Sequence, residues 1–504
     1  MTVLFFVSFK GWCLSHARPR RCFWPSAALL GLFSPLTGAQ IVTDGTVGPP
    51  VSLSGPEMTI GAELGATRGS NLFHSFQRFD IPSGQRATFT GPDRIQNVIG
   101  RVTGGQTSRI DGSLRSTVGQ ADVYLINPAG VVVGPNAKVD VPAALHLSTA
   151  DELRFSDGSR YSASDPAGST LTLAAPESFG FLSPQPASLT IDGSQLEVKS
   201  GKMATLTGGD VSIAGMADRR ATFKAPGGEI RIEAVGDEAA EVPVATPSPT
   251  PGRGRLAITQ ADLETSGDGG GRITIRAGEA ILDGAHLVAE NQGAVDATGG
   301  LDLRVAGALR LDDSWLFADT AARGSGGLVN LQAGELWIDA AVITSDSYRN
   351  DSVPTDDPIG AAGGVRVEVA GPAGLLNGAI LGSRAVADGD AGDVTLRVDG
   401  LLEVLNGAFI SSSTRAAGNA GTVSVQAGSV RLDSLGFDAW GTGIVSQAER
   451  DSIGDAGDIA LTVDGLLEVL NGAFISSSTW AAGNAGAVSV QAESVRLDSL
   501  GFDT

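Results

Sequence analysis

The sequence predicts an all-β chain folded as a solenoid, a parallel β-helix whose coils stack on one another. Three observations predict this fold. Apolar residues alternate with polar ones in short runs that glycine-containing turns separate. Glycine pairs recur in the second half at spacings of about 20 to 40 residues, the range of repeat arrays. Residues 391–438 recur almost verbatim at 456–503. A propeller is the alternative architecture for the same pattern.

The first 39 residues are typical of a targeting segment. The basic cluster at residues 18–21 precedes an apolar run at residues 23–36, and small residues follow up to Ala39. This run is too short for a membrane-spanning helix and contains prolines. We expect cleavage after Ala39. Both cysteines, Cys13 and Cys22, precede that point, so the mature chain is expected to contain no disulfide.

Residues 71–151 predict short strands joined by tight turns. The turns fall at residues 127–130 (NPAG) and 134–136 (GPN), where proline fixes φ and glycine or asparagine tolerates a left-handed conformation. Period-two apolar positions place side chains on one face of each strand. These positions are Val123, Leu125, Val131, Val133, Val139 and Val141.

Beyond about residue 205 the chain is a series of glycine-marked units. A Gly-Gly or Ala-Gly pair precedes alternating apolar residues, as in GRITI at 271–275 and GTVSV at 421–425. One such unit cannot bury its own apolar face, but parallel neighbours enclose a continuous core. The pairs lie at 208–209, 227–228, 270–271, 299–300, 326–327, 363–364, 391–392, 420–421, 456–457 and 485–486.

The two near-identical copies are offset by 65 residues, and each contains two Ala-Gly pairs. Each copy is therefore expected to form two or three coils. Asn406-Gly407 and Asn471-Gly472 are expected at sharp corners, because both residue types tolerate positive φ. Leu405 and Leu470, like Phe409 and Phe474, are expected at equivalent positions in their coils. The second copy stops where the first continues, so the repeat region is expected to be truncated.

Two polar segments interrupt the repeats. Residues 241–255 (EVPVATPSPTPGRGR) are rich in proline, which favours an extended linker, or alternatively a loop extruded from one coil. Residues 345–360 are expected to form a second extrusion. Both are candidate binding loops, although surface insertions without a partner are the commoner case.

Composition fits an exported, non-enzymatic repeat protein. The chain has 69 glycines among 504 residues, and only 5% of its residues are aromatic. The net charge of −21 argues against nucleic acid or anionic lipid as partners, because like charges repel. We therefore expect no nucleic-acid partner.

The residues that usually carry chemistry form no recognisable site. The histidines of the mature chain, His74, His146 and His286, lack zinc-ligand spacing. The serines at 411–413 and 476–478 lack a nucleophile elbow and are expected to face solvent. Acidic clusters at 388–393 and 454–458 match no calcium loop and are expected at solvated corners, with weak calcium binding as the alternative. We expect no catalytic residue, no metal and no cofactor.

The stretch from about Gln40 to about Phe181 resembles the N-terminal secretion domain of filamentous haemagglutinin-like exoproteins, the passengers of two-partner secretion (TPS) systems in Gram-negative bacteria. One departure is Ala129, where the family usually has asparagine, which puts the geometry of that turn in question. The motifs that carry the resemblance are residues 71–76 (NLFHSF), 101–105 (RVTGG), 110–112 (IDG), 125–128 (LINP), Gly130, Gly134 and residues 148–150 (STA).

The resemblance implies a right-handed β-helix with an N-terminal cap and extruded hairpins or loops. It implies export through an outer-membrane β-barrel partner with periplasmic domains, and a secreted or cell-surface location reached through the periplasm. The implied recognition or secretion motif comprises Asn71, Phe73, His74, Phe76, Arg101, Thr103, Gly104, Gly105, Asp111, Asn127, Pro128, Gly130 and Asn136. Most of these residues are expected to shape the recognised structure rather than to touch the transporter.

We therefore expect a signal peptide at 1–39, a two-partner secretion domain at 40–235, a proline-rich linker or loop at 236–255 and β-helical repeats at 256–504. The expected function is that of a secreted exoprotein whose repeats display an adhesin-like surface to host cells, bacteria or a matrix. The alternatives are a delivery stalk for an enzymatic or toxin module beyond residue 504, or a β-helical enzyme acting on polysaccharides.

Overall fold

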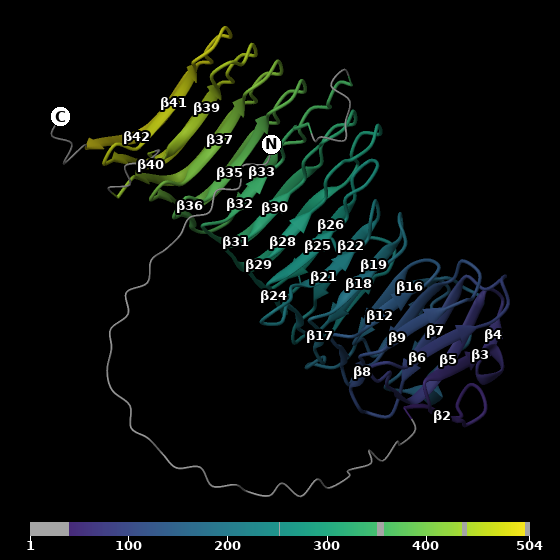
Figure 1. Ribbon diagram of the computed structural model, residues 1–504. Helices are drawn as coiled ribbons and strands as arrows, with labels where there is room; N and C mark the ends of the chain where they lie inside the picture. Colours follow the sequence, from purple (N-terminus) through teal and green to yellow (C-terminus); the bar gives the residue numbers. More distant parts are fainter. Residues whose placement is uncertain (1–39, 251, 350–356, 436–440, 499–504) are drawn as a thin grey trace, which may run out of the picture. The chain divides into compact units, whose positions relative to one another are not determined.

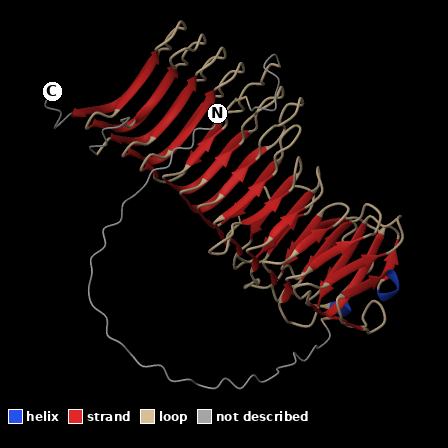
Figure 2. Cartoon of the chain, viewed as in Figure 1, coloured by secondary structure: helices blue, strands red, loops and turns tan. Residues whose placement is uncertain are grey.

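The computed structural model describes residues 40–250, 252–349, 357–435 and 441–498. The expected signal peptide, its cleavage site, both cysteines and the end of the second repeat lie outside the described residues. Strands dominate the fold (Figure 2), and the described part of the chain contains two single-turn 3₁₀ helices, η1 (Ala62–Leu64) and η2 (Pro166–Gly168). No helix in the described ranges is long and apolar enough to cross a membrane.

The N-terminal cap consists of short strands that close the first coil. In the cap, β1 pairs antiparallel with β2 and β5, β4 pairs antiparallel with β5, and β3 pairs parallel with β6. The strands of the cap and of the first three coils are β1 (Ile41–Thr43), β2 (Ser52–Leu53), β3 (Glu57–Gly61), β4 (Ala66–Arg68), β5 (Asn71–Phe79), β6 (Arg86–Thr90), β7 (Asn97–Val102), β8 (Ser108–Ile110), β9 (Ser113–Ser116), β10 (Asp122–Ile126), β11 (Val131–Val133) and β12 (Lys138–Asp140).

The coils continue without a break through the middle of the chain. Each strand pairs in parallel with its equivalent in the next coil, as β13 does with β19 and β19 with β22. The strands of this region are β13 (Leu145–Ser148), β17 (Leu189–Asp192), β18 (Gln195–Glu197), β19 (Met203–Gly208), β20 (Val211–Ala214), β21 (Ala221–Lys224), β22 (Glu229–Ala234), β24 (Arg255–Thr259) and β25 (Ala261–Glu264).

Four antiparallel strands leave the coils and form a separate sheet, here called the extruded sheet. They are β14 (Glu152–Phe155), β15 (Arg160–Ser162), β16 (Pro176–Phe181) and β23 (Ala240–Pro243), in the order β15-β14-β16-β23. A second apolar cluster, which includes Phe73, Tyr124, Phe155, Tyr161 and Phe179, fills the space between this sheet and the outer face of the first coils. The first coils are therefore covered on one side.

The proline-rich segment belongs to this covering layer. It leaves the solenoid after β22, contributes β23 to the extruded sheet and rejoins the solenoid at β24. Along the way, Arg231 donates to the carbonyl of Val244 (2.8 Å) and Arg276 donates to that of Ser248 (2.9 Å). The segment is thus an excursion from one coil, held against the outer surface by two buried arginines.

From β26 onward the coils become regular (Figure 1). The strands are β26 (Arg272–Ala277), β27 (Glu279–Asp283), β28 (His286–Val288), β29 (Gly300–Asp312), β30 (Trp315–Phe317), β31 (Leu328–Asp339), β32 (Val342–Thr344), β33 (Val365–Val369), β34 (Ala373–Leu376), β35 (Ile380–Ala385), β36 (Val394–Leu405), β37 (Phe409–Thr414), β38 (Val423–Asp433), β39 (Gly443–Ala448), β40 (Ile459–Leu470), β41 (Phe474–Thr479) and β42 (Val488–Asp498).

These pairings confirm the β-helix and contradict the propeller, whose blades pair their strands within themselves. The register runs from Val394 through Val423 and Ile459 to Val488, one residue per coil. Two successive coils, begun by β36 and β38, make one copy of the long repeat, and β40 and β42 begin the coils of the other. One apolar cluster extends through the interior from Ile41 to Leu467.

The recurring Ala-Gly pairs mark places where neighbouring coils approach closely. A Cβ on Gly421 would lie 2.3 Å from the carbonyl oxygen of Gly392, and one on Gly457 would lie 2.1 Å from that of Gly421. Only glycine fits such a stack. The expected corners are confirmed, because Asn406 and Asn471 have φ of 54° and 51°.

The prediction that the serines at 411–413 face solvent was wrong for Ser412 and Ser413, both of which are buried. Ser412 is fully buried, and its Oγ accepts a hydrogen bond from the amide of Gly421 (2.8 Å). Ser477 does the same for Gly486 (2.9 Å). Because side chains alternate along a strand, the middle serine of each triplet points inward and fastens the glycine corner.

Candidate functional site

The motif residues of the first coils meet around Arg101 on β7, whose side chain is buried although it is charged. Its Nε donates to Ser75 Oγ (2.8 Å), and Nη2 donates to Thr46 Oγ1 (3.0 Å). Nη1 donates to the carbonyl of Ser162 (2.7 Å) and to Ser169 Oγ (2.6 Å). One guanidinium therefore joins the cap, the first coil and the extruded sheet. We call this contact set, with Asp44 and Tyr161, the Arg101 junction.

Asp44 supplies the opposite charge through bridging hydroxyls. Its carboxylate accepts hydrogen bonds from Ser75 Oγ (2.6 Å), Thr46 Oγ1 (2.7 Å) and Thr103 Oγ1 (2.8 Å). Burial raises the pKa of Asp44, but the hydrogen bonds from Ser75, Thr46 and Thr103 outweigh it and hold that pKa below its usual value. The junction thus contains a carboxylate and a guanidinium linked through Ser75 and Thr46.

Phe73 and Tyr161 form the apolar side of the junction. Their ring centroids are 5.0 Å apart, and the Tyr161 hydroxyl donates to the carbonyl of His74 (2.9 Å). Phe76, three residues after Phe73, points to the opposite side of β5 and packs in the solenoid interior. The two phenylalanines therefore anchor the same strand to two different cores.

Asn71 ties the extruded segment to the solenoid from the other end of β5. Its amide nitrogen donates to the carbonyls of Thr172 (3.1 Å) and Ala174 (2.7 Å), and its oxygen accepts from Asn97 (2.8 Å). Asn71 is fully buried. The backbone of residues 172–174 therefore depends on a side chain about 100 residues earlier in the chain.

His74 lies fully buried between Phe76 and Phe89. No hydrogen bond of normal geometry reaches either ring nitrogen from the described residues, although the backbone of Leu64 lies close enough to favour the charged form. Burial lowers the pKa of His74 to about 4, and the backbone of Leu64 offsets this only in part. The imidazole is therefore uncharged at neutral pH.

Asn127 organises the turn after β10. Its amide donates to the carbonyl of Gln106 (2.9 Å) and to Ser108 Oγ (3.0 Å), while its oxygen accepts from the amide of Ala129 (2.9 Å). Pro128 follows at a half-buried position, and Gly130 has φ of +108°. With alanine at position 129 the turn still forms, because the amide of Ala129 bonds to the Asn127 side chain and the amide of Gly130 bonds to the Asn127 carbonyl (3.0 Å).

The remaining motif residues form exposed corners. Asp111 accepts from the amide of Asn136 (2.9 Å) in the next coil. A Cβ on Gly104 would lie 1.9 Å from the carbonyl oxygen of Gln77, and Gly105 has φ of +68°. Gly104, Gly105 and Asn136 are exposed, unlike Asn71, Phe73, His74, Phe76, Arg101 and Asn127, which are buried.

The predicted site residues did not include Asp44, Thr46, Asn97, Tyr161 or Ser169, and Ser75 entered only as part of the motif at residues 71–76. A signal was present for Asp44 and Ser75, because an arginine inside the apolar strand Asn97–Val102 requires buried acceptors. Nothing local indicates Tyr161, whose contact with Arg101 arises only when the extruded sheet folds back.

Several titratable groups outside this arrangement have structural partners. His146 is buried, stacks on Tyr124 at 4.3 Å and contacts Thr205 Oγ1 (2.9 Å). The corner carboxylates of Asp393 and Asp458 accept amides from the next coil (2.8 Å and 2.7 Å). Within the described ranges, no three His, Cys, Asp or Glu side chains come together as a metal site would require.

Comparison with known proteins adds three findings. The family model described as the TPS secretion domain matches residues 39–295, more than half of the chain. The heme/hemopexin-binding protein of Haemophilus influenzae is 36% identical over 107 residues, which are 21% of this chain and 11% of that protein. The crystal structure of the HMW1 secretion domain from Haemophilus influenzae aligns with a TM-score of 0.46 and 15% identity, covering 92% of this chain and 98% of that one.

Proposed function

The chain belongs to the TPS secretion domain family, and from this premise we propose that it is exported across the outer membrane by a dedicated β-barrel partner and displays its repeats outside the cell. The mature protein would then be secreted or held at the cell surface, and the repeats would form an adhesive surface. The proposed secretion motif is the set of residues named above, from Asn71 to Asn136.

The burial of the motif residues is the observation that supports two different roles within this set, one for buried residues and one for exposed residues. Asn71, Phe73, Arg101 and Asn127 are at most 1% exposed, so in the folded protein they cannot touch a transporter. Of these residues, Asn127 holds the exposed corner at residues 104–107 directly, because its amide donates to the carbonyl of Gln106, and the carbonyl of Ala129 accepts from Thr107. In this proposal the transporter contacts that corner and the buried motif residues act through it.

The proposal is tested by a secretion assay of the whole chain expressed with its partner. Asn127→Ala combined with Pro128→Ala should abolish secretion while synthesis continues. Asn406→Ala combined with Asn471→Ala changes two corner asparagines of the repeats and should be secreted normally. Normal secretion of the Asn127/Pro128 variant would contradict the proposal.

A second double variant distinguishes the loss of a contact with the transporter from the loss of folding. Gln106 is exposed on the corner and Arg109 is exposed on β8, two residues beyond it, so Gln106→Glu with Arg109→Glu changes the charge of this surface and leaves the interior intact. Secretion should fall while the urea midpoint of the protein stays unchanged. Unchanged secretion would mean that the transporter does not read this corner.

Stacking of the coils also suggests how export proceeds. Each coil that folds outside buries apolar surface against the one before it, which opposes backward movement. Leu402 and Leu467 are buried at equivalent places in β36 and β40. Leu402→Asp with Leu467→Asp should therefore slow secretion, and a normal rate would exclude folding as a driving force.

A further inference from the structure

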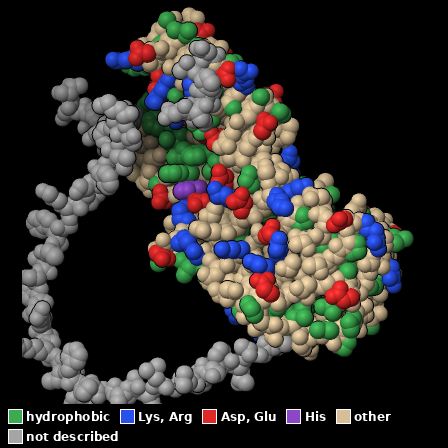
Figure 3. All heavy atoms as spheres, turned by 45° about the vertical axis from the view of Figure 1, so that its right-hand side comes forward, with side chains coloured by type: hydrophobic (Ala, Val, Ile, Leu, Met, Phe, Trp, Pro, Cys, Tyr) green, Lys and Arg blue, Asp and Glu red, His purple; other side chains and the backbone are tan. Residues whose placement is uncertain are grey.

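One face of the solenoid is formed by the sheet that runs from β18 to β41. On this face, a single outward-facing position carries a large side chain in nearly every regular coil. The strands β28, β30, β32, β35, β37, β39 and β41 pair in register along this face, and their inward residues fill the core. Figure 3 shows hydrophobic side chains gathered in a hollow beside a histidine. In register order, the position holds His286, Trp315, Val342, Ile380, Phe409, Gly443 and Phe474. We call these residues the apolar column.

The column is not covered by another part of the described chain. Trp315 is 44% exposed, and Phe409 and Phe474 are half-buried. Gly443 leaves a gap in the column. Across this gap Phe409 and Phe474 meet, with ring centroids 6.2 Å apart, and a Cβ on Gly441 would lie 2.7 Å from the Phe474 ring. The glycines therefore make room for the ring of Phe474.

Beside the column lies a hollow of about 410 Å³, within the size range of small-molecule sites. Val342, Ile380, Phe409 and Phe474 line one side of it. The adjoining outward position is small on the central strands, where it holds Gly382 and Ser411. These small side chains create the depth of the hollow.

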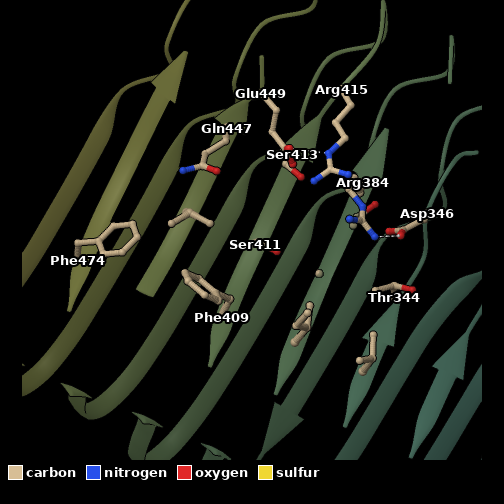
Figure 4. Close-up of a pocket in the computed structure, with 15 residues that line it drawn as sticks. Thr344, Asp346, Arg384, Phe409, Ser411, Ser413, Arg415, Gln447, Glu449 and Phe474 are labelled. Carbon is tan, nitrogen blue, oxygen red and sulfur yellow. Dashed lines mark hydrogen bonds and ion pairs between the residues drawn. The ribbon is translucent and has the colours of Figure 1, made fainter. Parts of the chain in front are cut away.

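Polar side chains form the opposite rim (Figure 4). Arg384 pairs with Asp346 (3.2 Å), and Arg415 pairs with Glu449 (2.5 Å). Gln447 lies on the same rim. The rim therefore offers planar, multidentate hydrogen-bonding groups, and its two cations and two anions balance.

This chemistry narrows the class of ligand. A balanced rim gives no net attraction for a polyanion, and the chain carries a net charge of −21. A peptide cannot add as a strand between β32 and β39, because the backbone of each of these strands is already paired with the coils on either side. An extended, uncharged oligosaccharide fits, since its rings have apolar C–H faces and hydroxyl edges.

We propose that this face binds such an oligosaccharide, laid across the strands along the direction in which the coils stack. The hollow spans five coils, from β32 to β41, or roughly 19 Å at the usual strand spacing. The C–H faces of the sugars lie on the apolar column, and their hydroxyls bond to the rim. The inference rests on the proposed display of the repeats outside the cell, but not on how the chain gets there.

The test measures binding of the purified full chain to linear neutral oligosaccharides, from disaccharide to octasaccharide, by calorimetry. The probes are β-linked glucans, xylans, mannans and chitooligosaccharides, with heparin-derived oligosaccharides as the charged comparison. At least one neutral series should bind, with affinity rising up to about five units. Phe409→Ala with Phe474→Ala should weaken binding by about tenfold or more.

Two further variants make the result decisive. Leu401→Ala with Leu466→Ala removes exposed leucines from the neighbouring face and should leave binding unchanged. Ser411→Trp fills the hollow without removing apolar contacts and should abolish binding. Lack of binding by every neutral series, binding of heparin oligosaccharides alone, or equal loss in the leucine variant would overturn the proposal. Secretion of the same variants, scored separately, reports on export alone.

Discussion

The guanidinium of Arg101 lies 4.1 Å from the centre of the Tyr161 ring. Arg101 belongs to a coil of the solenoid, and Tyr161 belongs to the extruded sheet. A cation held over an aromatic ring in a buried place is worth on the order of 2 kcal/mol. This contact therefore couples the stability of the first coils to that of the sheet that covers them.

Arg101→Ala should destabilise the protein by about 3 kcal/mol or more, because the carbonyl of Ser162 and the hydroxyls of Ser75 and Ser169 lose their donor in a buried place. Urea unfolding of the full chain measures the effect. Arg366→Ala is the control, because Arg366 is 57% exposed and pairs with Glu368 at the surface. Equal effects of the two substitutions would contradict the central role of Arg101.

Stability should fall as the pH decreases from 6.5 to 4. Burial lowers the pKa of His74 to about 4 and that of His146 to about 3, whereas an unfolded histidine has a pKa near 6.5. Below pH 6.5 the unfolded chain therefore binds protons that the folded chain does not, which favours unfolding. Each of these two histidines should lower the free energy of unfolding by on the order of 3 kcal/mol at pH 4.

The check is the urea midpoint as a function of pH in His74→Phe. This variant should depend less on pH than the parent, because its buried side chain cannot bind a proton. His286→Phe should change the pH dependence less than His74→Phe, because His286 is partly exposed beside Asp262, although burial and Arg220 lower its pKa as well. A parental pH dependence in His74→Phe would refute the assignment.

Gly421→Ala should destabilise the repeats by about 2 kcal/mol, because the new methyl group would lie 2.3 Å from a carbonyl oxygen of the preceding coil. Gly465→Ala is a milder comparison, since its nearest neighbour is 3.1 Å away. Thermal unfolding followed by circular dichroism distinguishes the two. Equal midpoints would show that the stack tolerates side chains.

Substitutions of two neighbouring serines should have very different effects on the stability of the protein. Ser412→Ala leaves the amide of Gly421 without its acceptor and should cost about 1 to 2 kcal/mol. Ser411→Ala changes the outward face next to it and should be nearly neutral. A similar loss of stability in both variants would place the inward hydrogen bond in doubt.

Local patterns in the sequence were enough to predict the coils and their corners. The Asn406-Gly407 corner follows from the backbone preferences of two residue types. The glycine pairs were visible as a period, but their reason was not, because the distance from Gly421 to Gly392 exists only between coils. Likewise, alternation along β37 could have placed Ser412 inside, had Phe409 been assigned outward.

The partners of the motif residues could not be predicted in this way. Asn71 holds the carbonyls of Thr172 and Ala174, and Arg101 holds that of Ser162. These contacts depend on where an excursion of some thirty residues returns to the solenoid. A period in the sequence describes neighbours in a stack, but it carries no information about a segment that leaves the stack.

The glycine contacts between coils also bear on how such a gene can change. Because Gly421, Gly457 and Gly486 each lie against the carbonyl oxygen of the equivalent glycine in the preceding coil, a pair of coils can be inserted or deleted with both new junctions resembling the old. Unequal recombination between the two copies would therefore give proteins whose repeat arrays differ in length and whose residues 39–295 are unchanged.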